Sequence, residues 1–242
     1  MGDLVVVAHP DDETAGLGGW LAACGDPAAV DICILTDGAP RAARFRAVDF
    51  RGNRAAYRRQ RRSEARAAAA ALGLDPARLH FAPFADQELF RNLAAAADWL
   101  AARAARLRPT RVWAPAYEGG HPDHDAANFL AARLLSGVDL WEFSLYSARE
   151  GQVRYLQPAG AGWRRWLLAP AARYAKRSAL ACYRSQAPTL APFDGGAEFI
   201  RPLPRHDYSR PAAPGRAVWE LWGWPICAAD PCRAFQAWPS YV

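Results

Sequence analysis

The sequence contains no apolar run of the roughly 18–20 residues that a membrane-spanning helix needs. Its first residues, Met1-Gly2-Asp3, include no basic segment followed by an apolar one, so we predict neither a secretion signal nor a membrane span and expect a cytoplasmic protein. The 242 residues are 52% apolar, which is ample for one sizeable core. These features argue against an integral membrane protein.

Cysteine is scarce and odd in number, which argues against the disulfide framework of a small exported protein. The five cysteines are Cys24, Cys33, Cys182, Cys227 and Cys232. Cys24 and Cys33 have strand-like apolar neighbours, so we interpret them as small core side chains. Cys227 and Cys232 lie close enough in the sequence to pair, but two free thiols are the favoured interpretation.

Lysine is nearly absent: Lys176 is the single lysine among 30 basic residues, and arginine carries the net charge of +6. The densest basic run is Arg54–Arg66. We favour a solvated helix face there, because the run includes Glu64 and matches no nucleic-acid motif. A nucleic-acid partner, which would have to use this run, is therefore not expected. A third interpretation is that part of the run faces an anionic group of a substrate.

A glycine-rich dinucleotide fingerprint is also missing, because Gly16-x-Gly18-Gly19 falls inside the first expected helix rather than at its start. Strands and helices nevertheless alternate through the first half. The expected strands are Leu4–Val7, Val30–Leu35, Leu79–Phe81 and Val112–Ala114, and the expected helices are Gly16–Cys24, Arg54–Leu72, Asn92–Leu107 and Asp125–Leu135. This order predicts an α/β fold, a Rossmann-like, doubly wound and mostly parallel sheet with helices on both faces.

The pattern becomes irregular in the second half, where Leu140–Ser147 is an expected strand and Ala171–Arg184 an expected helix. We predict a single domain over 1–242, in which 1–138 form the α/β core. Residues 139–242 form an irregular C-terminal subdomain that completes the sheet and the substrate pocket.

Two polar or aromatic groups stand out in the C-terminal part. Trp219, Trp222 and Trp224 are either core under an irregular chain, which we favour, or a surface on which sugar rings stack. The polar island His206-Asp207-Tyr208-Ser209 is a candidate for the pocket rim.

The first of two histidine–aspartate motifs, Ala8-His9-Pro10-Asp11-Asp12-Glu13, directly follows the apolar strand Leu4–Val7. Open α/β sheets bind their ligands at the carboxyl ends of such strands. His9 and Asp12 are three residues apart and can converge on one point, and an imidazole with a carboxylate suits Zn²⁺. Asp11 then remains as a second carboxylate that can take a proton from water.

The second motif, His121-Pro122-Asp123-His124, repeats the spacing of three residues. Catalytic zinc usually has three protein ligands, so His9, Asp12 and one of these two histidines would complete a site. The remaining histidine could protonate a leaving group or stabilise an oxyanion. Each motif alone is more typical of a helix cap and turn than of a metal site, but together they favour a metal-dependent hydrolase of amides or esters.

The two motifs together resemble the PIG-L/LmbE-like zinc-dependent N-deacetylases, and the resemblance covers nearly the whole chain. Further segments agree with this family. They are Leu35-Thr36-Asp37-Gly38, then Arg61-x-x-Glu64 with Ala68 and Leu72-Gly73, then Lys176-x-x-Ala179-Leu180, Tyr183-x-Ser185-Gln186 and Glu198-Phe199.

The resemblance implies a role for each motif residue. It implies that His9, Asp12 and His124 bind one zinc ion per chain, and Fe²⁺ would accept the same ligands. It implies that Asp11 is the general base and that His121 assists the oxyanion or protonates the leaving amine. Arg61 and Asp86 fall where some members contact the substrate. Tyr117 is the tyrosine nearest to the position of a mobile tyrosine that some members carry before the second motif.

We therefore predict a zinc-dependent hydrolase that removes the acetyl group from an N-acetylated amino sugar of the N-acetylglucosamine type, or from its glycoconjugate. An amidase of a longer N-acyl glycoconjugate or of a thiol conjugate is the alternative. The expected partner is this small molecule, with no nucleic acid and no membrane, and a homo-oligomer is possible.

Overall fold

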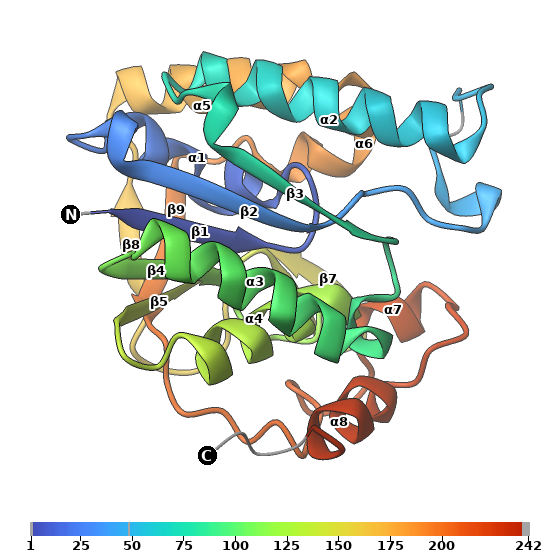
Figure 1. Ribbon diagram of the computed structural model, residues 1–242. Helices are drawn as coiled ribbons and strands as arrows, with labels where there is room; N and C mark the ends of the chain where they lie inside the picture. The colour runs from blue at the N-terminus through green and yellow to red at the C-terminus, as the bar shows by residue number, and fades with distance from the viewer. Residues whose placement is uncertain (1, 48, 239–242) are drawn as a thin grey trace.

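The computed structural model describes residues 2–47 and 49–238, and its centre is a seven-stranded sheet of order β3-β2-β1-β4-β5-β9-β8 (Figure 1). The strands are β1 (Asp3–Val7), β2 (Val30–Thr36), β3 (Leu79–Phe84), β4 (Arg111–Pro115), β5 (Asp139–Phe143), β8 (Arg164–Leu167) and β9 (Ala197–Pro202). The first five strands pair in parallel, while β9 and β8 join antiparallel. The predicted α/β class with a mostly parallel sheet is confirmed.

Helices cover both faces of this sheet, as predicted. In Figure 1, α1 (Asp12–Ala23), α2 (Arg54–Ala71) and α5 (Pro170–Cys182) lie on one face, and α3 (Leu93–Leu107) and α4 (Pro122–Leu134) on the other. Each layer has its own apolar core, because the strands are buried on both sides. No helix in the described part of the chain is long and apolar enough to cross a bilayer.

Two helices begin three or four residues earlier than predicted, and both extensions lie within the histidine–aspartate motifs. Helix α1 begins at Asp12 rather than Gly16. Helix α4 begins at Pro122 rather than Asp125, because His121 caps it by accepting the Asp123 backbone N–H and proline suits the first helical position. The motif side chains are therefore fixed at helix N-termini.

The single strand predicted over 140–147 is wrong. It is two elements in different sheets: β5 ends at Phe143, and β6 (Tyr146–Arg149) forms an antiparallel hairpin with β7 (Gln152–Tyr155). The chain turns between them because the Ser144 hydroxyl and the Leu145 backbone N–H both donate to the Glu118 carboxylate. This turn carries the hairpin toward the second motif.

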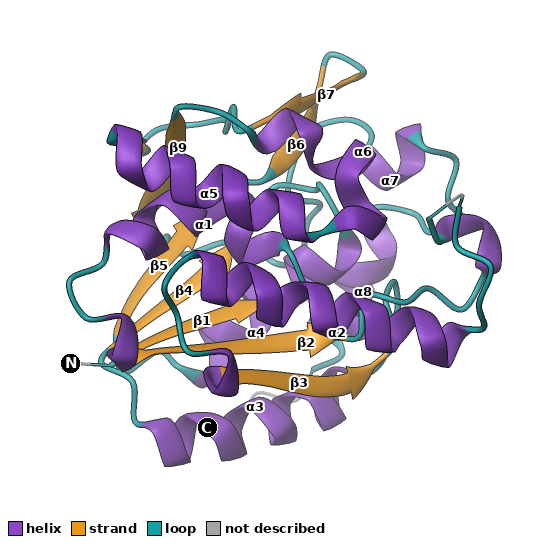
Figure 2. Ribbon diagram, turned by 90° about the horizontal axis from the view of Figure 1, so that it is seen from above, coloured by secondary structure: helices purple, strands orange, loops and turns teal. Residues whose placement is uncertain are grey.

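Several elements of the C-terminal part lie beside the carboxyl ends of the parallel strands (Figures 1 and 2). They are the β6–β7 hairpin and the short helices α6 (Ala187–Leu190), α7 (Val218–Leu221) and α8 (Ala229–Gln236). The strands β7, β8 and β9 were not predicted. All five cysteines are free thiols, as expected; Cys33 is buried, which raises its pKa to about 12, whereas Cys24 is only half-buried.

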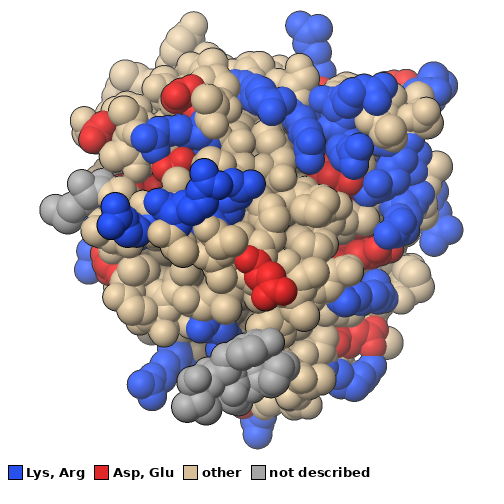
Figure 3. All heavy atoms as spheres, in the orientation of Figure 1, with Lys and Arg blue, Asp and Glu red and all other residues tan. Residues whose placement is uncertain are grey.

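Basic side chains gather over α2 and the loop that follows β2, at the upper right of Figure 3. Most arginines of Arg54–Arg66 are exposed or half-buried, as a solvated face requires. Arg61 is the exception: it is 3% exposed and points into the molecule. The basic run therefore divides into a surface group and one buried guanidinium.

Candidate active site

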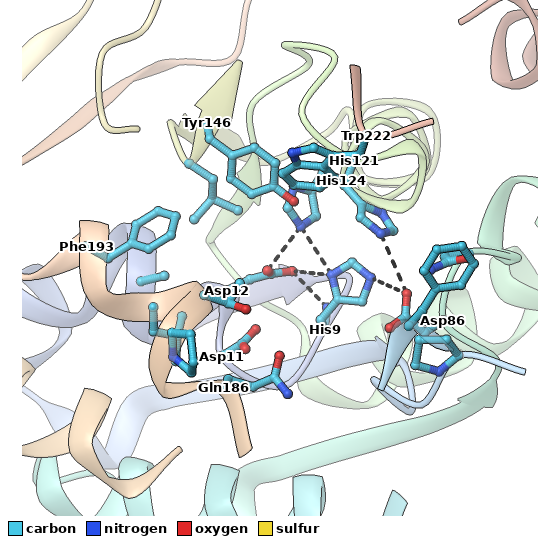
Figure 4. Close-up of a pocket in the computed structure, with 18 of the residues that line it drawn as sticks. His9, Asp11, Asp12, Asp86, His121, His124, Tyr146, Gln186, Phe193 and Trp222 are labelled. Carbon is cyan, nitrogen blue, oxygen red and sulfur yellow. Dashed lines mark hydrogen bonds and ion pairs between the residues drawn. The ribbon is translucent and has the colours of Figure 1, made fainter. Parts of the chain in front are cut away.

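The two motifs meet where the neighbouring parallel strands β1 and β4 end (Figure 4). His9 Nδ1 lies 3.2 Å from His124 Nε2 and 3.4 Å from Asp12 Oδ2, and His124 Nε2 lies 3.0 Å from Asp12 Oδ1. All three residues are buried. The structure thus brings together the three residues predicted as metal ligands.

The Asp12 carboxylate is oriented by the backbone. Its Oδ2 accepts hydrogen bonds from the backbone N–H groups of Ala8 and His9 at 3.1 and 2.8 Å, which directs Oδ1 toward His124. Burial opposes ionisation, but the neighbouring imidazoles outweigh it and hold the pKa of Asp12 well below its usual range. The residue is therefore an ionised carboxylate.

These three side chains fit a divalent cation. One ligand atom from each lies within 4.8 Å of the others, and a buried set of two imidazoles with one carboxylate suits zinc. Burial disfavours a charged His9 ring, yet the carboxylates of Asp86 and Asp12 hold its pKa well above the usual value. The site therefore attracts positive charge.

A second group of potential ligands shares His9 and includes Asp86, His121 and Asp123. Both oxygens of Asp123 are already engaged, because they accept the backbone N–H groups of Gln87 and Leu89 at 2.6 and 2.9 Å. His121 Nδ1 accepts the Asp123 N–H at 3.0 Å, which assigns the ring proton to Nε2. A protonated nitrogen cannot bind a metal, so the group of His9, Asp12 and His124 is the better metal site.

His121 faces the same space as a hydrogen-bond donor. Burial, together with the nearby rings of His9 and His124, lowers the pKa of His121 well below its usual value, so the ring is neutral. Its Nε2–H points toward Asp86 Oδ1, 3.6 Å away. This arrangement provides a donor for an oxygen that develops negative charge.

Asp11 lies next to the metal group in an unusual backbone conformation, with φ of 141°. Its N–H donates to Glu13 Oε2 at 3.2 Å, and Glu13 Oε1 accepts the Tyr183 hydroxyl at 2.6 Å. Burial raises the pKa of Asp11 to about 7, although the Arg61 guanidinium opposes the shift. A carboxylate with this pKa is suited to accept a proton near neutral pH.

The two residues predicted to bind substrate lie in the same cavity but have protein partners. Arg61 Nη2 donates to Asp11 Oδ2 at 3.0 Å, and its Nη1 is buried without a hydrogen-bond partner in the described part of the chain. Asp86 Oδ1 lies 3.2 Å from His9 Nε2. Arg61 therefore keeps one N–H donor free, whereas the Asp86 carboxylate lies against the rings of His9 and His121.

The cavity has a volume of about 390 Å³ and an aromatic wall of which the sequence suggested only the tryptophans. Tyr146, Tyr155, Phe193, Trp222 and Trp224 form this wall, and they come from the hairpin and from the segments around α6 and α7. Tyr146 lies against His124 because Gly120 permits close approach: a Cβ there would meet the Tyr146 carbonyl oxygen at 2.1 Å.

Three other expectations about aromatic and polar residues are now resolved. Trp219 is buried core, as favoured, but Trp222 and Trp224 line the cavity. His206 does not line the cavity, contrary to the expectation for the polar island, because its Nε2 pairs with Glu142 at 2.9 Å. The Tyr117 hydroxyl donates to the Arg210 carbonyl at 2.6 Å, outside the cavity lining.

Comparison with solved structures identifies similar folds. A deacetylase of teicoplanin biosynthesis in complex with bog has a TM-score of 0.64 and 21% identity, over 86% of this chain and 99% of that one. The zinc-inhibited form of teicoplanin deacetylase Orf2 has a TM-score of 0.61 and 20% identity, over 86% and 99%. GalB, the 4-carboxy-2-hydroxymuconate hydratase of Pseudomonas putida KT2440, has a TM-score of 0.55 and 22% identity, over 80% and 83%.

At these identities the likeness shows the fold alone, and the fold carries both deacetylases and a hydratase. None of the curated proteins matches the chain. The family model described as PIG-L: GlcNAc-PI de-N-acetylase matches residues 4–135, more than half of the chain. The resemblance predicted from the two motifs is thereby confirmed, and the chain belongs to the GlcNAc-PI de-N-acetylase family.

Proposed function

We propose that this protein is a zinc-dependent N-deacetylase that converts an N-acetylated amino sugar, or its glycoconjugate, to a free amine and acetate. One observation carries the proposal. A buried group of His9, Asp12 and His124 that fits a metal ion lies in one cavity with a carboxylate of pKa about 7 and a neutral imidazole donor. Metal-assisted hydrolysis of an amide uses this combination of groups.

In the proposed mechanism His9, Asp12 and His124 hold one zinc ion per chain. When bound, zinc polarises the acyl carbonyl and lowers the pKa of water. Asp11 accepts the proton of the attacking water, and Arg61 holds the Asp11 carboxylate in place. His121 donates from Nε2 to the carbonyl oxygen as charge develops there. The proton that Asp11 accepted then passes to the nitrogen as the C–N bond breaks.

The cavity supports an amino sugar as substrate. The free Nη1 donor of Arg61 is available for a sugar hydroxyl, and the Asp86 carboxylate can accept one. Aromatic rings such as Tyr146 and Trp222 provide apolar faces against which a sugar ring packs. An amidase of a longer N-acyl conjugate or of a thiol conjugate is the alternative, and the released acid distinguishes the two.

The test combines metal content with product analysis. Purified protein is assayed for bound metal and for acetate release from a panel of N-acetyl amino sugars and N-acetylglucosaminyl conjugates, before and after chelation. We expect about one metal per chain and chelator-sensitive acetate release. Release of a longer acid would favour the amidase, and absence of metal after reconstitution with Zn²⁺ would contradict the proposal.

A further inference from the structure

A second cavity of about 430 Å³ lies beside the proposed catalytic cavity. The two share Gln186, Pro188 and Thr189 as lining residues, so this short segment is the wall between them. On the opposite rim, Phe45 lines the catalytic cavity and the next residue, Arg46, lines the second one. A ligand that leaves the catalytic cavity over residues 186–189 therefore enters the second cavity.

The charges of the two cavities are opposite. Asp11, Asp12 and Asp86 line the catalytic cavity, and the one arginine of its lining, Arg61, is paired with Asp11. The lining of the second cavity instead holds Arg46, Arg51 and Arg184 against a single carboxylate, Asp49. Arg46 and Arg51 come from the loop after β2, and Arg184 follows the end of α5.

One of these arginines, Arg46, is held in place by hydrogen bonds within the protein before any ligand binds. Arg46 is half-buried, and its Nε and Nη2 donate to the backbone carbonyls of Pro40 and Arg41 at 3.0 and 2.8 Å. These neutral acceptors orient the guanidinium without cancelling its charge. Arg184 is exposed, and among the described residues it has no hydrogen-bond or ion-pair partner. A preorganised cation beside an unpaired one suits an anionic ligand.

Three of the neutral polar side chains in this lining donate to other groups of the protein. Ser185 donates to Glu64 through both its backbone N–H and its hydroxyl, and Gln60 Nε2 donates to Glu64 at 3.1 Å. Gln186 Nε2 donates to the Tyr57 hydroxyl at 2.7 Å. Charge recognition in the second cavity therefore falls to the arginines, and the exposed Thr189 hydroxyl is a further polar group of the lining.

We propose that the second cavity binds an anionic group, a phosphate or a carboxylate, that the substrate carries on the part of the conjugate remote from its N-acyl group. This inference rests on the proposed function for the orientation of the substrate. The N-acylated sugar occupies the acidic, aromatic cavity, while the anion lies across residues 186–189.

The first experiment tests the cavity without catalysis. Binding of inorganic pyrophosphate to the full-length protein, in a phosphate-free buffer of low ionic strength, is measured by titration calorimetry. We expect saturable binding that salt weakens and that Arg184→Gln weakens roughly tenfold. Arg59→Gln is the matched control, because Arg59 is an exposed arginine of α2 outside the cavity lining. Absence of binding, or equal losses in both variants, overturns the proposal.

The second experiment asks whether the substrate uses the cavity. Acetate release is compared for three N-acetylglucosaminides whose aglycones have equal length and end in a phosphate, a carboxylate or a neutral amide. We expect a higher kcat/KM for the phosphate and carboxylate compounds than for the neutral one. The compound with the higher kcat/KM of these two identifies the anion that the cavity prefers. Arg184→Gln should lower kcat/KM for the two anionic compounds to the value of the neutral one. It should leave kcat/KM for the compound whose aglycone ends in an amide unchanged.

The two proposals fail in different ways. Equal kcat/KM for all three compounds would overturn the anionic subsite and leave the deacetylase intact. No acetate from any compound would contradict the deacetylase. The calorimetric measurement of pyrophosphate binding would still show whether the second cavity binds an anion.

Discussion

Arg61 Nη2 lies 3.0 Å from Asp11 Oδ2, and the two side chains are only 3% and 10% exposed. The guanidinium reaches this carboxylate from the middle of α2, 50 residues along the chain, and its Nε also donates to the Gly38 carbonyl at 3.3 Å. A buried charge left without its partner is destabilising. The pair therefore ties α2 to the loop that carries the proposed base.

Removal of one partner should cost more than removal of both. We expect Arg61→Gln to lower the free energy of unfolding by about 3 kcal/mol, because it leaves the Asp11 carboxylate buried and unpaired. Adding Asp11→Asn should restore part of this loss. Urea denaturation of both single variants and the double variant measures the coupling, and strictly additive losses would contradict a direct interaction.

Asp11→Asn alone separates binding of a metal from proton transfer. The amide keeps the size of the side chain but cannot accept a proton, so we expect turnover to fall by at least about 100-fold while the metal content stays at the wild-type level. Acetate release and elemental analysis of the same preparation provide the two measurements. Unchanged turnover would exclude Asp11 as the base.

Elemental analysis also distinguishes the two groups of potential ligands. His124→Ala should abolish stoichiometric metal binding, because it removes one of three ligands. Asp86→Asn and His121→Ala should still bind metal, with an affinity that falls by no more than about 10–100-fold, since they only surround the ligands. The reverse result would place the metal between His9, Asp86 and His121 instead.

The sequence predicted the convergence of the motifs because a general rule governs it. Short apolar strands such as Leu4–Val7 are recognisable, and side chains that follow neighbouring parallel strands must meet at one edge of the sheet. The early starts of α1 and α4 were missed because the motif residues that form the first turn of each helix are polar. Their polarity hid the helical periodicity.

The rest of the aromatic wall and the burial of Arg61 could not be predicted from the sequence, for a different reason. Tyr146 and Phe193 come from a hairpin and a single 3-10 turn, which are too short for any periodicity. Arg61 is one of many arginines in its helix, and only the packing of α2 against the loop after β1 shows that it is buried. Tertiary contacts, which one sequence does not encode locally, decide both cases.

Neighbouring tryptophans should respond differently to truncation. Trp219 is 1% exposed, so Trp219→Ala should cost about 3–5 kcal/mol of stability through the cavity it leaves. Trp222 is 43% exposed and lines the catalytic cavity, so Trp222→Ala should change stability by less than about 1 kcal/mol but raise KM. Urea denaturation and steady-state kinetics separate these effects. Equal losses of stability would contradict the division of the cluster into core and cavity wall.

The buried carboxyl group of Glu118 should make the stability of the protein depend on pH. Burial raises its pKa from 4.5 to about 7, although the Leu145 N–H and the Ser144 hydroxyl favour the ionised form. A carboxyl whose pKa rises on folding contributes most to stability below its unfolded pKa, and this contribution is lost as the pH rises toward the folded pKa. The free energy of unfolding that Glu118 contributes should therefore fall between pH 4.5 and about 7.

Glu118→Gln should remove this dependence, because its amide oxygen still accepts the Leu145 N–H and its NH₂ group donates to Ser144 without any charge. Relative to wild type, the variant should gain roughly 1–3 kcal/mol between pH 5 and pH 8. Thermal and urea denaturation across this range measure the difference. Glu150→Gln, which makes the same substitution at an exposed turn, is the matched control. A constant difference between Glu118→Gln and wild type would mean that Glu118 does not change its protonation in the folded protein.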